Sequence, residues 1–383
     1  MSIYFTLLLA LFIDTGFKTG RVIITLYALK LGAQPFTVGA MAAAFFLLPT
    51  LLSWRVGRFS DRFGSRWLII VGAAAGALGM SAPYVAPGLP ALFVTSVLYG
   101  LLTALTAPPL QNLVGLQSGP QDSVRNFSNL SLIFSFASLT GPLIAGFMLD
   151  YAGPGVTCLS MVLLTLVPAA MLLVWGGRLP RGTGIAKPPG SVRLLLSESG
   201  LWRVLATSSL VITGVDLFQV YMPIYGHGIG LSASAIGFVL AIYALAAFVV
   251  RVFLPSLVKR LTAERALAYS FLIGATGFLL VPFFKGIWIL CLVSFFFGIG
   301  MGCGQPITLM MTFSTSTQGR SGEAMGLRLT VNHLTRVIGQ VLFGSIASAC
   351  GVFSVFWVNA FMLASGWAIS WRRAADRRRH GGS

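Results

Sequence analysis

The sequence predicts an all-α membrane protein in which twelve helices cross the bilayer. Of its 383 residues, 56% are hydrophobic and only 9% are charged, whereas a soluble domain has about 25% charged residues. Long apolar runs recur at the length of about 20 residues that a helix needs to cross a bilayer core. Lys and Arg gather in the short segments between these runs. Most of the protein surface is therefore expected to face lipid.

Six apolar runs in the first half of the chain each predict one membrane-spanning helix. They lie at residues 3–30, 36–57, 67–86, 90–114, 124–149 and 154–176. The second half predicts six more, at residues 200–227, 233–257, 265–284, 287–312, 322–348 and 352–371. Residues 178–199, between the two groups, are rich in Gly, Pro and basic residues, which is typical of a linker. We expect one domain over 1–177, a cytoplasmic linker over 178–199, a second domain over 200–371 and a basic tail over 372–383.

The two halves resemble each other when the sequence is shifted by 198 residues. Matches such as Gly100 with Gly298 and Pro108 with Pro306 need no gap and extend over several of the predicted helices. The other matched pairs are Gly32/Gly230, Gly39/Gly237, Gly76/Gly274, Gly79/Gly277, Gly141/Gly339, Gly146/Gly344, Gly153/Gly351 and Tyr27/Tyr225. Gly and Pro determine turns and close helix contacts, so the register predicts two related six-helix bundles. Repeats of this kind are typical of secondary transporters.

The net charge of +17 is explained by membrane topology. Basic residues concentrate in alternate loops, between the halves and in the tail, so the positive-inside rule places both termini in the cytoplasm. We therefore expect contact with membrane lipid and no nucleic-acid partner. The four cysteines form no CxxC pair, no P-loop motif is present and the histidines are far apart. The sequence predicts no metal, no cofactor and no enzymatic activity.

The loop after the second predicted span carries a recognisable motif. Residues 57–66 read GRFSDRFGSR, which resembles the loop signature G-x-x-x-D-R-x-G-R-R of the major facilitator superfamily. Gly57, Asp61, Arg62 and Gly64 match, and Ser65 departs where the family usually has a basic residue. The resemblance implies a major facilitator fold, with twelve transmembrane helices in two pseudo-symmetric six-helix bundles, acting as a monomer in a bacterial inner membrane.

A second motif bears on the direction of transport. Residues 140–146 in the fifth span read TGPLIAG and resemble the Gly-Pro motif that the family's antiporters and exporters carry there. Gly141 and Pro142 match, and Ala145 replaces a second glycine. The family's drug–proton antiporters usually have an arginine four residues before Gly100, where this chain has Ser96. The motif favours export, without coupling through that arginine.

Charged residues at membrane depth are costly unless paired or wetted, and they are the first candidates for a functional site. Lys18, Arg21, Arg251, Arg328 and Arg336 outnumber the carboxylates Asp14 and Asp216. An excess of cations favours an anionic or carboxylate-bearing cargo. Internal pairing of the same groups, for example Asp216 with an arginine of span eleven, is the competing interpretation.

From these patterns we predict three sets of site residues. Substrate binding falls to Arg21, Arg328, Arg336, Asn332, Gln219, Tyr221 and Gln305. Proton coupling falls to Asp14, Asp216 and His333, and conformational gating to Gly57, Asp61, Arg62, Gly64, Gly141 and Pro142. The predicted function is proton-coupled export of a small organic solute by antiport and alternating access. Proton-coupled uptake of a small carboxylate is one alternative, and a receptor or lipid scramblase is an alternative from another class.

Overall fold

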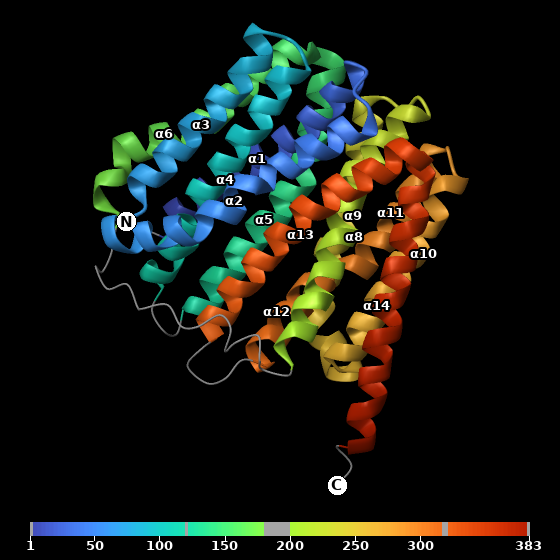
Figure 1. Cartoon of the computed structure of the whole chain (residues 1–383). Coiled ribbons are helices and arrows are strands. Elements are labelled where there is room, and N and C mark those ends of the chain that lie inside the picture. Colours follow the sequence, from blue (N-terminus) through green and yellow to red (C-terminus); the bar gives the residue numbers. More distant parts are fainter. Residues whose placement is uncertain (1–2, 119–121, 180–199, 316–320, 381–383) are drawn as a thin grey trace. The chain divides into compact units, whose positions relative to one another are not determined.

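The computed structural model describes residues 3–118, 122–179, 200–315 and 321–380, and almost all of them are helical (Figure 1). The first half forms α1 (Ile3–Lys30), α2 (Pro35–Phe63), α3 (Arg66–Val85), α4 (Leu89–Gln117), α5 (Ser123–Phe147) and α6 (Gly153–Trp175). A π-helical turn, η1 (Met148–Ala152), joins α5 to α6, and a 3-10 turn, η2 (Gly176–Arg178), follows α6. Most of the predicted linker lies outside the described residues.

The second half forms α8 (Leu201–Gly228), α9 (Ala233–Leu261), α10 (Ala263–Leu280), α11 (Ile287–Gly302), α12 (Gly304–Thr315), α13 (Ser321–Cys350) and α14 (Val352–His380), with the 3-10 turn η3 (Val281–Phe283) after α10. Most predicted spans coincide with these helices to within a few residues. Two helices continue past the predicted ends at residues 57 and 371: α2 extends to Phe63, and α14 extends to His380, through most of the predicted tail. The predicted span at 287–312 is interrupted at Cys303 and forms α11 and α12.

The described helices supply the twelve predicted spans when α11 and α12 are counted as one. By length and composition, nine stretches of the described residues are apolar enough to cross a membrane, and one of them, Arg125–Trp175, contains both α5 and α6. The helices α1 and α13 are not among the nine. These are the two helices that carry most of the charged residues predicted at membrane depth.

The internal repeat is visible in the backbone. Among the described residues, positive φ angles occur at Gly32 and Gly230 (77° and 85°) and at Gly153 and Gly351 (78° and 84°). They also occur at Gly64 (90°) and, among non-glycine residues, at Thr262 (64°). Each pair is 198 residues apart, which is the shift found in the sequence. The same unusual turn therefore follows the same helix in both halves.

Internal contacts divide the chain into two compact units. Unit 1 comprises Met1–Pro188 and Gly230–Ala241, and unit 2 comprises Pro189–Ile229 and Ile242–Ser383. The first turns of α9 thus belong with the N-terminal helices, although the rest of α9 belongs with the C-terminal helices. This division differs from the predicted boundary only in that short segment of α9.

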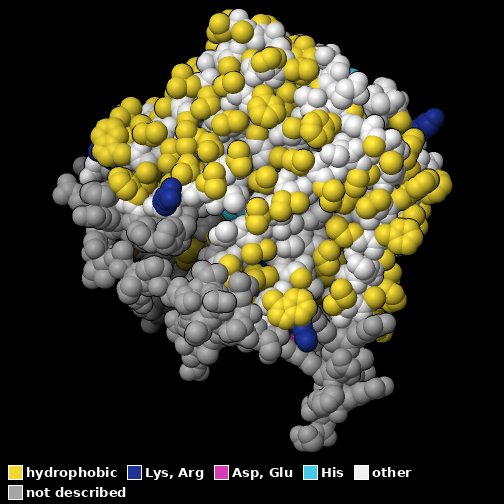
Figure 2. Space-filling model, viewed as in Figure 1, with side chains coloured by type: hydrophobic (Ala, Val, Ile, Leu, Met, Phe, Trp, Pro, Cys, Tyr) yellow, Lys and Arg dark blue, Asp and Glu magenta, His cyan; other side chains and the backbone are white. Residues whose placement is uncertain are grey.

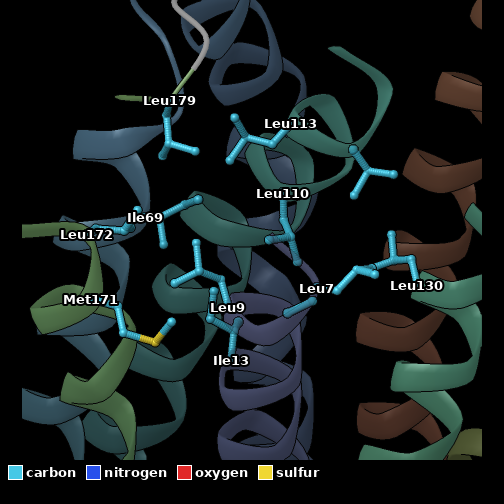
Figure 3. Packing of buried hydrophobic residues seen from close by; sticks show 12 residues of the cluster. Leu7, Leu9, Ile13, Ile69, Leu110, Leu113, Leu130, Met171, Leu172 and Leu179 are labelled. Atoms are coloured by element: carbon cyan, nitrogen blue, oxygen red, sulfur yellow. The ribbon is translucent and has the colours of Figure 1, made fainter. Parts of the chain in front are cut away.

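In unit 1, aliphatic side chains from five helices interlock around α1 (Figure 3). Leu9 and Ile13 of α1 lie near Ile69 of α3, Leu110 of α4 and Met171 of α6. Lipid tails are as apolar as these side chains, so the packing stabilises the unit through dispersion contacts more than through removal of surface from water.

In unit 2, the corresponding role falls to aromatic rings. The ring of Phe218 on α8 stacks on Phe297 of α11 at 4.4 Å between centroids, and Phe278 of α10 meets Phe297 edge-on at 4.9 Å. Tyr243 of α9 lies 5.2 Å from Phe218. Four helices are therefore held together by one ring cluster, which keeps α8 rigid beside the charged residues described below.

The surface is suited to lipid. Figure 2 shows one face on which hydrophobic side chains are widespread and only a few Lys or Arg side chains appear among the described residues. Large apolar side chains such as Trp288 and Phe361 are 76% and 80% exposed. In water such a surface would aggregate, so it supports the membrane assignment made from composition.

Candidate functional site

An ion pair joins α8 to α13 in unit 2. Arg336 donates from Nε to Oδ2 of Asp216 at 2.5 Å. Asp216 is 3% exposed, whereas the Arg336 side chain is 22% exposed. The two residues were predicted as proton-coupling and substrate-binding groups, and the structure brings them together as each other's partner.

Arg328 lies two turns before Arg336 on α13 and has a different environment. It is 4% exposed, and it donates from Nε to the Ser208 hydroxyl at 3.1 Å and from Nη2 to the Thr308 hydroxyl at 3.1 Å. Longer contacts from Nη2 reach the backbone and side-chain oxygens of Gln305, at 3.4 and 3.5 Å. All of these partners, within the part of the chain that the structure describes, are neutral.

The other predicted site residues of unit 2 differ in their burial and in their hydrogen-bond partners. Asn332 is buried and accepts a hydrogen bond from Ser208 at 3.0 Å. His333, half-buried on α13, is within electrostatic reach of both Asp216 and Arg336. Gln219 on α8 is half-buried. The Tyr221 hydroxyl is fully buried and makes no hydrogen bond to a described residue, and its predicted contact with the cargo stays a prediction.

Arg251 has a structural task that the sequence did not reveal. Pro306 lacks the N–H that would bond to the Gly302 carbonyl one turn earlier, and the helix breaks there. Arg251 of α9 donates from Nε to this carbonyl at 3.1 Å. The side chain thus satisfies the backbone at the α11–α12 break.

In unit 1, the predicted charges lie along α1. Asp14 is half-buried and interacts electrostatically with Lys18, one turn further on. Arg21 is 5% exposed, and its guanidinium lies 5.2 Å from the ring centroid of Phe46 on α2.

The Gly-Pro motif of α5 touches both α1 and α9. A side chain at Gly141 would meet the Cβ of Lys18 at 2.7 Å, so the glycine allows α5 to pack directly on the charged part of α1. The Pro142 carbonyl occupies the place where a side chain on Gly237 of α9 would lie, and Gly146 meets the Ala233 carbonyl of α9 in the same way. These close contacts require glycine on both helices.

The loop motif after α2 is partly described. Gly64 ends α2 with φ of 90°, a conformation that favours glycine, and a side chain at Gly57 would meet open space. The side chains of Asp61 and Arg62 lie outside the described residues, so their predicted gating role stays a prediction. At the departure from the motif, the Ser65 hydroxyl lies 2.9 Å from the Ser60 hydroxyl and donates to the Pro109 carbonyl of α4 at 3.2 Å.

Two polar residues of interest were not singled out from the sequence. Ser208 lies two turns before Asp216 on α8, and this spacing is the signal that would have found it. Asp150 lies in the turn after α5, and its carboxylate accepts hydrogen bonds from the backbone amides of Ala233 (3.2 Å) and Ser234 (2.6 Å) at the start of α9. Among the described residues, no group of three or more His, Cys, Asp or Glu is arranged to hold a metal ion.

Comparison with known families and proteins agrees with the fold. The family model described as Major Facilitator Superfamily matches residues 6–284 and 209–382. Quinolone resistance protein NorA from Staphylococcus aureus is 22% identical over 337 residues, which cover 85% of this chain and 84% of that protein. The class G tetracycline resistance protein from Vibrio anguillarum is 22% identical over 324 residues, covering 81% and 80% of the two chains.

Solved structures show the same architecture at low sequence identity. A POT family transporter in complex with 5-aminolevulinic acid superposes with a TM-score of 0.83 at 12% identity, covering 98% of this chain and 96% of the other. The nucleoside transporter NupG superposes with a TM-score of 0.77 at 13% identity, covering 97% and 99%. At these identities the likeness establishes the fold and leaves the cargo open.

Proposed function

The chain belongs to the major facilitator superfamily of transporters, and from that premise we propose that it is a proton-coupled exporter of small, carboxylate-bearing organic solutes. It would work as a monomer by alternating access in a bacterial inner membrane, with both termini in the cytoplasm. Two features support export over uptake. The relatives named above are resistance proteins for quinolones and tetracycline, and α5 carries the Gly-Pro motif.

The observation that carries the coupling is the Asp216–Arg336 pair. An arginine at membrane depth is costly without a counter-ion, so loss of the charge on Asp216 must be balanced by another anion near Arg336. Protonation of Asp216 would remove its charge and make Arg336 available to bind another anion. This pair therefore links proton binding to the charge of the site, which is the requirement for coupled transport.

The same pair also favours the second candidate, uptake by symport. When a proton on Asp216 makes Arg336 available to a simple anion, proton and anion help each other to bind and would travel together. Antiport needs competition between proton and cargo. A solute with a basic group beside its carboxylate supplies that competition, because its cation replaces the proton next to Asp216.

Reconstituted vesicles with an imposed pH gradient test the proposal, with a fluorescent quinolone as the probe. An antiporter accumulates the probe on the acidic side, and a symporter accumulates it on the alkaline side. Asp216→Asn should abolish accumulation in either case while leaving downhill exchange. Asp122→Asn is the matched control, because Asp122 is an exposed partner of Arg125 in the loop before α5. Transport that does not depend on the pH gradient would refute proton coupling through this pair. Unchanged accumulation of the probe by the Asp216→Asn variant would refute it as well.

A further inference from the structure

The arginines of α13 differ in what balances their charge. Arg336 has the carboxylate of Asp216, so that pair is neutral as a whole. Arg328, by contrast, has hydroxyls and amide oxygens as its partners, and no carboxylate among the described residues pairs with it. Counting Arg328, Arg336 and Asp216 together leaves one positive charge on the described face between α8 and α13. That charge belongs to Arg328.

The two hydroxyl groups around Arg328 do not depend on it for the hydrogen bonds that they donate. Ser208 donates its hydroxyl hydrogen to the Asn332 side chain at 3.0 Å, and Thr308 donates to the Gln305 carbonyl at 3.0 Å. Both hydroxyl donors would therefore stay satisfied if the guanidinium were removed. Because an arginine only donates, its removal would free acceptor positions on these oxygens and would leave neither of the two hydroxyl donors without a partner.

One edge of the guanidinium is left for a ligand. Nε and Nη2 are engaged by Ser208, Thr308 and Gln305, while Nη1 makes no hydrogen bond to a described residue. Ser208 and Thr308 come from α8 and α12, so two helices hold the guanidinium plane in one orientation. A charge held in this way, 4% exposed and with no counter-ion among the described residues, is expected to bind an anion.

We propose that Arg328 forms an anion subsite for the single carboxylate of the transported solute, with Ser208 as its positioning residue. The sequence grouped Arg21, Arg328 and Arg336 as one cationic site, and this assignment separates them. Arg336 is committed to Asp216, and Arg21 lies in unit 1 over the ring of Phe46. The subsite rests on the proposed function in one respect, namely that its occupant is the cargo.

The stability of two matched variants tests the subsite without knowledge of the cargo. Arg328→Met removes a buried charge for which the described part of the chain supplies no counter-ion, and it should raise the Tm of the ligand-free protein by about 2 to 4 °C. Arg336→Met removes one member of a buried pair, leaves Asp216 unbalanced and should lower the Tm. Opposite signs at two arginines on one helix are the expected result. A lower Tm for Arg328→Met would make Arg328 a structural tie and overturn the proposal.

Benzoate, with benzamide as its neutral counterpart, tests the ligand class. Benzoate should raise the Tm of the unmodified protein more than benzamide does, and Arg328→Met should remove the difference. Ser208→Ala should weaken benzoate binding about five-fold by releasing Nε, corresponding to roughly one net hydrogen bond, and Ser208→Thr should restore it. Equal effects of benzoate and benzamide would exclude a carboxylate subsite. The proposed coupling through Asp216 is judged separately by the pH-gradient experiment, so either proposal can fail alone.

Discussion

At the scale of single residues, identical side chains acquire different roles from their neighbours. Arg328 and Arg336 lie on one face of α13, eight residues apart, and the sequence treats them alike. The structure gives Arg336 a carboxylate, whereas the partners of Arg328 among the described residues are neutral acceptors. The partners come from α8 and α12, more than 100 and about 20 residues away in the chain, so no local pattern predicts which arginine is balanced.

Thr262 shows the converse, a residue whose strain follows from the repeat. It occupies the position equivalent to Gly64, with φ of 64° and ψ of 157°, where Gly64 has 90° and 167°. This region is essentially restricted to glycine and costs a threonine about 1–3 kcal/mol. Thr262 is exposed and makes no side-chain capping hydrogen bond to α10.

Thr262→Gly should therefore stabilise the protein by roughly 1 kcal/mol, because relief of strain exceeds the extra entropy of a glycine in the unfolded chain. Thermal unfolding in detergent measures the change as a higher Tm. Gly64→Ala is the matched control and should lower the Tm, since it introduces the same strain in the first half. A destabilised Thr262→Gly variant would mean that the threonine side chain has a role that offsets its strain.

At the scale of elements, helix ends and breaks are satisfied by side chains from other helices. Arg251 of α9 bonds the carbonyl that Pro306 leaves without a donor. Arg66 at the start of α3 donates to the Leu172 and Leu173 carbonyls near the end of α6, at 3.1 and 3.2 Å. The Asp150 carboxylate accepts hydrogen bonds from the first backbone amides of α9. These contacts hold each unit together where the backbone alone would leave polar groups in lipid.

Asp150→Asn should loosen the first turn of α9. The substitution removes the negative charge and one acceptor from a helix N-terminus, a change of about 0.5–2 kcal/mol. Amide hydrogen exchange at Ala233–Ala235 should then become about 3- to 30-fold faster. The first turn of α2, which has no side-chain cap at Gln34, should exchange at an unchanged rate. Equal exchange at α9 in both proteins would show that the carboxylate contributes no stability there.

At the scale of the whole molecule, the positive-inside rule assigns each connecting segment to one side of the membrane. The turn between α13 and α14, at Cys350 and Gly351, is predicted to face away from the cytoplasm. Cys350 is exposed, whereas Cys158, Cys291 and Cys303 are buried. The natural cysteines therefore provide a topology probe that requires no substitution.

A membrane-impermeant maleimide should label this protein at Cys350 alone in right-side-out vesicles. Peptide mapping of the labelled chain identifies the site, and Cys350→Ser is the control that should abolish labelling. If Cys350 reacts only after the membrane is permeabilised, the predicted orientation is reversed and the termini lie outside. Reaction at Cys158, Cys291 or Cys303 would instead indicate that the packing of the units is looser than the structure shows.

The sequence by itself determined the class, the twelve helices and their register, because each depends on local or periodic features. Apolar length sets the spans, and the 198-residue repeat recurs as paired turns at Gly32/Gly230, Gly64/Thr262 and Gly153/Gly351. The loop and Gly-Pro motifs were enough to predict the superfamily that the comparisons then established.

Only the tertiary structure decided which charges are paired and which polar residues hold them. The partners of Asp216, Arg328 and Asp150 lie on helices distant in sequence, and pairing depends on which helix faces meet. The break at Cys303 and the task of Arg251 likewise emerge only when α9 is placed beside α11. Charge at membrane depth can be counted along a sequence, but in a medium of low dielectric its effect is set by the nearest opposite charge, and that neighbour is provided by packing.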